Sequence, residues 1–186
     1  MSVWLIVVVA VVAVAVWLYN SLVGLRNQVR NAWAQIDVQL KRRHDLIPNL
    51  VAAVKGYMQH EREVLERVSE ARARAMAASG AAQAGPAEGQ LSQAVGRLIA
   101  VMERYPDLKA NQNVLALQEE LVSTENRIGF ARQLYNDMVA RYNTRQQVFP
   151  LNLVAGGLGF QPAEFFEMDA AERAVPRVDL QPGGGR

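Results

Sequence analysis

The chain begins with a long uncharged apolar run, and this run constrains how the rest of the molecule is placed. Residues 3–19 read VWLIVVVAVVAVAVWLY and contain no charged residue, proline or glycine. With its apolar flanks the run is about 20 residues long, and as a helix it spans about 30 Å, which matches the hydrocarbon core of a bilayer. Trp4, Trp17 and Tyr19 lie near its two ends, where aromatic rings favour the headgroup boundary. The sequence therefore predicts a membrane anchor that begins at Val3 and contacts the lipid bilayer through residues 3–19.

The main alternative to an anchor is a cleavable signal peptide. Residues 13–15, Ala-Val-Ala, have the small-x-small form that signal peptidase accepts. A signal peptide also carries a basic segment ahead of its apolar core, whereas only Met1 and Ser2 precede this run. Cleavage would in addition leave a mature chain that starts with exposed apolar residues. We therefore favour an anchor that is retained.

Basic residues lie on one side of the apolar run. None precedes it, whereas Arg26 and Arg30 follow it and a cluster at residues 41–43 comes next. Because Lys and Arg collect on the cytoplasmic side of membrane proteins, the N-terminus is expected outside and the remaining chain in the cytoplasm. The sequence thus predicts a single-pass protein of the inner (cytoplasmic) membrane.

The composition of the remaining chain favours helices and limits the possible chemistry. Alanine and long polar helix formers are abundant after the apolar run, and β-branched residues are few. A formal charge of +2 is too small to indicate nucleic-acid binding. The absence of cysteine excludes disulfides, thiolate metal sites and a cysteine nucleophile.

Helical periodicity starts soon after the apolar run. The apolar residues that form its first stripe are Val29, Trp33, Ile36 and Leu40. Asp45 is a possible N-cap and Pro48 suits the first turn of a new helix, so we expect the helix to break there. The heptad pattern nevertheless continues past Pro48, which leaves a single kinked helix as the alternative. Arg43 interrupts that heptad pattern at an otherwise apolar position.

The rest of the sequence predicts three further segments and a tail. A helix over residues 48–78 precedes the Gly- and Ala-rich stretch 79–90, which we interpret as a linker. A shorter helix follows over residues 91–105, and a long one with apolar residues every seven positions covers residues 108–147.

These segments predict an all-α fold, in which the transmembrane helix continues into an antiparallel up-and-down bundle of about four helical segments. The expected organisation is an anchor over residues 1–20, a helical-bundle domain over 21–150, and a tail over 151–186. The tail is expected to pack partly on the bundle and to be disordered from about Asp169.

Several stretches of this sequence resemble the LemA family of bacterial membrane proteins. The most specific is RNQVRNAWAQIDVQLKRRHDLIPNLV at residues 26–51, followed by VKGYMQHE at residues 54–61. Further matches are TENRI from Thr124, ARQLYN from Ala131, YNT from Tyr142, Phe149-Pro150, Gly159-Phe160 and Phe165-Phe166-Glu167. The resemblance implies one N-terminal transmembrane helix, an extracytoplasmic N-terminus and a helical bundle, and it implies no known enzymatic activity.

Few residues suggest catalysis or metal binding. His60-Glu61 begins like the zinc motif His-Glu-x-x-His, but Val64 occupies the position of the second histidine. The alternative to a non-enzymatic role is a membrane-tethered hydrolase or metal-dependent enzyme that uses His44, Asp45, His60 and Glu61. Helical spacing does not bring the two histidines onto one turn, so we assign no catalytic, cofactor or metal residues.

Charged residues near the apolar stripes suggest how the helices choose their partners. We expect Asp37 and Glu125 to meet arginines across helix interfaces, because buried ion pairs can specify register even where they add little stability. The alternative is a set of solvated salt bridges of little energetic weight. The residues of this proposed network are Asp37, Arg42, Arg43, Glu125, Arg127 and Arg132.

The lengths of the predicted helices suggest an association surface. The third helix is much shorter than the fourth, so part of the fourth helix is expected to lack an intrachain cover and to bind a second copy. The aromatic residues of this surface are Tyr135, Tyr142, Phe149, Phe160, Phe165 and Phe166. The predicted function is a non-enzymatic, membrane-anchored interaction or scaffold protein that forms homo-oligomers and recruits unidentified partner proteins at the membrane.

Overall fold

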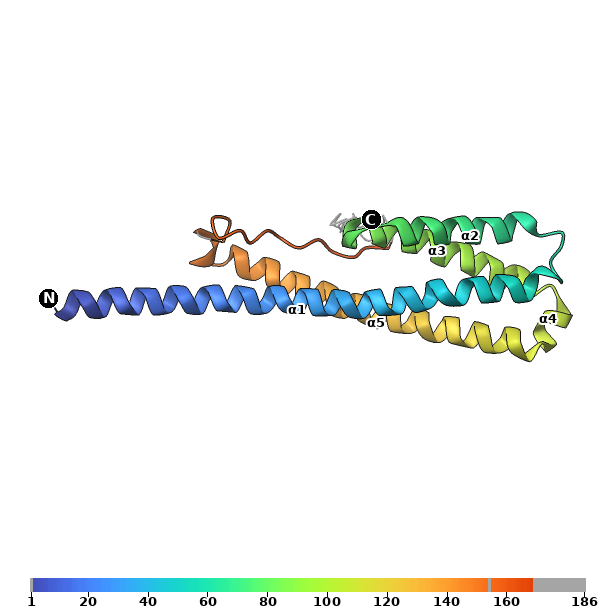
Figure 1. Ribbon diagram of the computed structural model, residues 1–186, viewed down its shortest axis with the longest axis horizontal. Coiled ribbons are helices and arrows are strands. Elements are labelled where there is room, and N and C mark those ends of the chain that lie inside the picture. Colours follow the sequence, from blue (N-terminus) through green and yellow to red (C-terminus); the bar gives the residue numbers. More distant parts are fainter. Residues whose placement is uncertain (1, 154, 169–186) are drawn as a thin grey trace, which may run out of the picture.

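The computed structural model describes residues 2–153 and 155–168, and its regular elements in these ranges are all helical. The four long helices alternate in direction along one axis, so the molecule is a rod (Figure 1). This confirms the predicted all-α fold and up-and-down bundle. The elements are α1 (Ser2–Lys55), α2 (Arg62–Ala77), α3 (Gly80–Met102), α4 (Pro106–Ala110), α5 (Gln112–Gln147) and the 3-10 helix η1 (Leu151–Leu153).

Helix α1 continues for 54 residues without a break, so the expected interruption near Asp45 was wrong. Pro48 lies inside the helix and removes the N–H that would bond to the carbonyl of His44. Arg72 of α2 replaces it, because its Nε donates to that carbonyl at 2.6 Å. A residue from another helix therefore satisfies the backbone group that the proline leaves open.

The stretch Ser79–Gln90 is not a linker, because α3 begins at Gly80 and already includes most of it. Its small residues serve close packing. A Cβ atom on Gly85 would lie 2.2 Å from the carbonyl oxygen of Glu167, and one on Gly89 would lie 2.2 Å from that of Met168. The glycines therefore let the backbone of the C-terminal segment lie directly against α3.

Residues 161–168 form an extended segment that runs back along the rod from the end of α5 towards α3 (Figure 1). Two asparagines of α5 hold it. The side chain of Asn136 exchanges hydrogen bonds of 3.1 and 2.9 Å with the backbone of Phe166, and that of Asn143 exchanges bonds of 2.9 and 2.8 Å with the backbone of Ala163. The two asparagines are seven residues apart in a helix, a rise of about 10.5 Å, and their partners are three residues apart in an extended segment, about 10 Å. The spacing of the side-chain amides on α5 therefore matches the spacing of the backbone groups that they bind.

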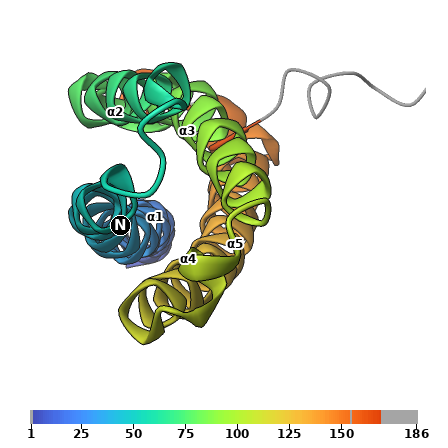
Figure 2. The ribbon, with the colours of Figure 1, turned by 90° about the vertical axis from the view of Figure 1, so that its right-hand side faces the viewer.

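The buried apolar residues at positions 2–153 and 155–168 form two cores. The proximal core lies towards the N-terminus and joins α1, α5, the start of α3 and the C-terminal segment, from Leu22 to Phe166. The distal core joins the end of α1 to α2, α3, α4 and the start of α5, from Leu46 to Leu121. The α2–α3 hairpin thus covers the distal half of the α1–α5 pair, and the C-terminal segment covers much of the proximal half. Figure 2 shows the four long helices end-on.

The first part of α1 projects beyond the rest of the chain (Figure 1). Its most apolar 18-residue window is 6% buried, so it is not a core helix of the bundle. By length and composition it can cross a membrane. The same helix then continues into the bundle, as the sequence predicted, and its first residue in the proximal core is Leu22. The expected disorder from Asp169 falls outside the described residues.

The glycine contact predicts a measurable difference between two similar substitutions in α3. Gly85→Ala should displace the C-terminal segment and lower the free energy of unfolding by about 1–3 kcal/mol, because the added Cβ meets backbone that cannot rotate away. Gly96→Ala meets nothing within 4 Å and should be neutral or stabilising by up to about 1 kcal/mol. Thermal unfolding of both full-length variants in detergent, followed by circular dichroism, tests this. Equal melting temperatures would contradict it.

Candidate functional site

A buried ion pair lies between the two cores, where α1 meets α3. Arg43 and Glu88 are each 1% exposed, and the Arg43 guanidinium donates to the Glu88 carboxylate. The same guanidinium donates to Ser92 Oγ at 2.8 Å and to Glu125 Oε2 on α5 at 2.6 Å. Ser92 Oγ in turn donates to Glu125 Oε1 at 3.0 Å. One arginine therefore connects three helices.

The carboxylate of Glu88 has a second partner in α1. His44 Nε2 lies 2.7 Å from Glu88 Oε1. Burial alone would raise the pKa of Glu88, but the hydrogen bond to His44 and the charge of Arg43 outweigh it, so the pKa lies below its usual value. The carboxylate is thus ionised at neutral pH and accepts hydrogen bonds from both α1 residues.

This cluster corresponds in part to the predicted register-setting network. Of the six candidates the structure brings Arg43 and Glu125 together. Arg42 instead pairs with Glu120 at 2.5 Å on the surface. Of the other three, Asp37 and Arg127 are exposed and Arg132 is partly buried.

The central acidic residue of the cluster, Glu88, was missed. It lies in the Gly- and Ala-rich stretch that the sequence presented as a linker. A usable signal was present in α1, because Arg43 occupies an apolar position of the heptad pattern. A charge at such a position requires a buried partner.

The alternative catalytic set is not assembled. His44 lies mid-way along the packed part of α1 and binds Glu88, whereas His60 is exposed in the loop after the helix. Asp45 is exposed, and Glu61 approaches Arg104 and Tyr105. In the part of the chain that the structure describes, no group of three or more His, Asp or Glu side chains has the geometry of a metal site.

The predicted association surface is mostly inside the molecule. Tyr135, Tyr142, Phe160 and Phe166 are buried in the proximal core, which corrects the expectation that this part of α5 is uncovered. The reason is the C-terminal segment, which lies over α5 where the short third helix was expected to leave a gap. Of the six aromatic residues, only Phe149 and Phe165 are exposed.

Tyr135 illustrates how this covering is made. Its ring packs against Trp33 of α1 at 5.4 Å between centroids, and its hydroxyl donates to the carbonyl of Glu164 at 2.8 Å. Burial, with a smaller contribution from the Glu164 charge, raises its pKa. The phenol is therefore a neutral structural donor at physiological pH.

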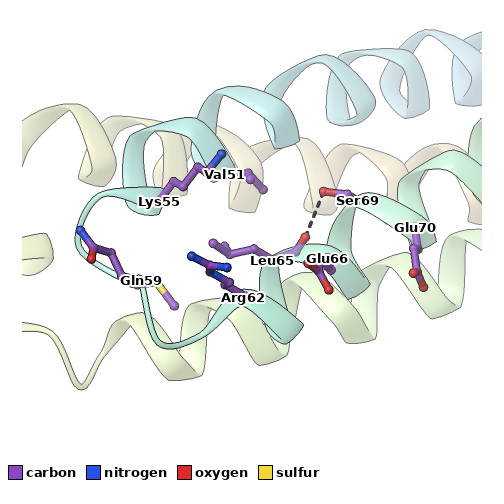
Figure 3. A pocket seen from close by; sticks show the side chains of 9 residues that line it. Val51, Lys55, Gln59, Arg62, Leu65, Glu66, Ser69 and Glu70 are labelled. Carbon is purple, nitrogen blue, oxygen red and sulfur yellow. Dashed lines mark hydrogen bonds between the residues drawn. The ribbon is translucent and has the colours of Figure 1, made fainter.

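An open pocket of about 610 Å³ lies between the end of α1 and α2 (Figure 3). Its lining combines apolar residues such as Leu65 with charged ones of both signs. Ser69, the hydroxyl in this pocket, donates to the Leu65 carbonyl of its own helix at 2.9 Å. That bond occupies the hydroxyl proton within the helix, so this serine is not hydrogen-bonded to a general base. The lining residues are Val51, Lys55, Met58, Gln59, Arg62, Leu65, Glu66, Ser69 and Glu70.

A second opening of about 540 Å³ is a groove between α1 and α5, which we call the α1–α5 groove. Phe130 is 73% exposed and Val38 62% exposed along it, and neither is covered by the α2–α3 hairpin. The exposed apolar surface of α5 is therefore formed by this groove and not by Tyr135 and Tyr142, which the sequence suggested. Its lining residues are Ala34, Gln35, Val38, Gln39, Arg127, Phe130, Ala131 and Leu134.

Comparison with known proteins identifies a family. The LemA family model matches residues 32–180 of this chain. Magnetosome protein MamQ 2 of Paramagnetospirillum magneticum is 26% identical in an alignment 186 positions long, which covers 86% of this chain and 68% of that protein. Protein LemA of Metamycoplasma hominis is 27% identical over 156 residues, which cover 83% of this chain and 71% of that protein. Neither name states an enzymatic activity, and the resemblance found from the sequence is confirmed.

The coupling between Arg43 and Glu88 can be measured with a double-mutant cycle. Glu88→Leu should lower the free energy of unfolding by about 3–5 kcal/mol, because Arg43 is left buried without its main counter-charge. Adding Arg43→Met should restore part of this loss, since it removes the uncompensated charge. Thermal unfolding in detergent measures each variant.

A neighbouring arginine supplies the control for this cycle. Arg42→Met removes the exposed pair with Glu120 and should change stability by about 0–1 kcal/mol. A double variant of Arg43 and Glu88 that loses as much as the two single changes added together would show that the pair is not coupled.

Proposed function

This chain belongs to the LemA family, and from that membership and its fold we propose that it is a membrane-anchored, non-enzymatic helical scaffold. The observation that carries the proposal is the continuity of α1. One helix is exposed and apolar in its first part and forms the core of the bundle in its later part. The bundle is therefore joined to the membrane span without a flexible hinge.

The proposed orientation follows from the charges beside the span. Arg26 and Arg30 follow the apolar run, and the positive-inside rule supports a cytoplasmic location for the bundle that carries them. The protein would then be a single-pass component of the inner membrane with its N-terminus outside. Beyond Leu22, α1 extends about 50 Å, so the bundle would hold its distal end that far from the bilayer.

The geometry supports a scaffold better than an enzyme. The buried charges of Arg43 and Glu88 are paired with each other, and the α1–α2 pocket lacks an activated hydroxyl. A catalytic site needs a convergent set of acid, base and nucleophile in a cleft. The surface offers an apolar groove instead, and such grooves typically bind another protein.

We propose that the α1–α5 groove binds a second copy of this chain. Membrane anchoring would hold neighbouring copies parallel, with their α1 helices at the same height. A twofold axis along the membrane normal would then bring Phe130 of each copy against the groove of the other. The homo-oligomer expected from the sequence is thus assigned to a different surface from the one first considered.

The anchor predicts how the full-length chain behaves in bacterial membranes. It should stay in the membrane fraction at alkaline pH, and a chain that starts at residue 21 should be released, because the described part of the bundle contains no further helix long and apolar enough to span a bilayer. A reporter enzyme fused after Arg186 should be active in the cytoplasm. Release of the full-length chain would contradict the anchor, and reporter activity only outside the cytoplasm would contradict the orientation.

The groove predicts a surface-specific loss of self-association. Phe130→Glu should weaken the oligomer at least about tenfold, because burying a Phe side chain is worth about 1.5–3 kcal/mol. Met76→Glu changes an exposed apolar residue of α2 and should have no effect. Light scattering of the detergent-solubilised protein over a concentration series measures both. An unsubstituted chain that remains monomeric at every concentration would refute the proposed oligomer.

A further inference from the structure

The chain turns after α5 at the end of the rod from which the anchor projects (Figure 1). Two contacts place this turn beside the end of the apolar run. The Arg145 guanidinium lies 5.8 Å from the centroid of the Trp17 ring, and the Phe160 ring lies 5.5 Å from that of Tyr19. The loop between Arg145 and Phe160 is therefore level with the aromatic residues that end the anchor.

This loop exposes large apolar side chains. Phe149 is 75% exposed and Leu153 is 72% exposed, and Val148 and Leu158 are exposed as well. No charged residue occurs between positions 146 and 163. A surface loop in water normally carries polar residues, so a cluster of exposed apolar side chains without a charge indicates an interaction surface.

The loop is held firmly although its tips are exposed. Leu151, Ala155 and Phe160 are buried in the proximal core and alternate with the exposed residues along the chain. Arg26 covers the Phe160 ring at 5.1 Å from its centroid. The exposed residues are thus presented on a packed base that is attached to α1 itself.

The height of the loop fits the surface of a bilayer. A hydrocarbon core about 30 Å thick takes about 20 helical residues, so a span that starts at Val3 ends near Leu22. The loop contacts α1 just before that point, at Trp17 and Tyr19. Arg26 and Arg145 lie beside it, where cationic side chains reach phosphate headgroups.

We propose that residues 148–153 and 155–158 form a second membrane contact, in which Phe149, Leu153 and Leu158 insert at the boundary between headgroups and acyl chains. This inference rests on the proposed anchoring of α1. The loop enters the same leaflet from which α1 emerges. Two points of attachment, the span and the loop, fix the tilt and the rotation of the rod relative to the membrane.

The absence of cysteine allows a direct test with single labels in the full-length chain. Phe149→Cys and Leu153→Cys each carry an environment-sensitive fluorophore in the loop. Val8→Cys reports insertion of the span, and Val122→Cys labels an exposed position on α5 far from the loop. Each protein is reconstituted in phosphatidylcholine–phosphatidylglycerol vesicles that contain a lipid spin-labelled near the headgroup or deeper in its acyl chain.

The expected result is strong quenching of the two loop labels by the shallow spin label and of the Val8→Cys label by the deeper one, with the Val122→Cys label unaffected. The proposal is overturned if the span label is quenched while both loop labels behave like the Val122→Cys label. Loop labels that are shielded from a water-soluble quencher but not quenched by lipid would show that a protein covers the loop, which also overturns it. If no label is quenched, the anchor itself fails and the second contact fails with it.

Discussion

The pairing of Arg43 with Glu88 is the interaction on which the arrangement of the helices depends. It lies where the proximal and distal cores meet and joins α1 to α3, with Glu125 adding α5. Isolating either charge inside the bundle costs several kcal/mol, so a shift of the α2–α3 hairpin by one turn along α1 is strongly disfavoured. The apolar stripes supply the driving force for packing, and we propose that this polar layer selects the register in which they pack.

The C-terminal segment covers the proximal part of α5 through hydrogen bonds to its backbone and not through helix packing. It supplies no helix, yet it covers α5 because Asn136 and Asn143 present amide pairs at the spacing of extended backbone. Gly85 then admits the same backbone against α3. Helix α3 therefore stays short without leaving the proximal tyrosines in water, whereas the α1–α5 groove remains open.

The sequence predicted what depends on local pattern and missed what depends on distant partners. The apolar run and the heptads of α1 and α5 gave the fold class. Pro48 carried a true local signal for a break, which Arg72 overrides from another helix by bonding to the His44 carbonyl. The stretch around Gly85 was interpreted as a linker because glycine marks loops as well as close backbone contacts, and this hid Glu88. The sequence did indicate the site through Arg43, because a charged residue at an apolar heptad position requires a buried partner.

The continuity of α1 couples the membrane to the fold. Its side chains are exposed along the first turns and core residues begin at Leu22. If the first turns lie in lipid, as proposed, the surroundings of α1 change from lipid to protein within a few residues. A loop that packs against this part of α1 is in contact with the protein core on one side and with the proposed bilayer surface on the other. The loop has side chains of both kinds: Leu151 is buried in the proximal core, whereas Leu153 is exposed and can contact the proposed bilayer surface. In the proposed arrangement, the loop and the span together set the tilt of the rod where the chain leaves the membrane, and the ion pair of Arg43 sets the register of the helices.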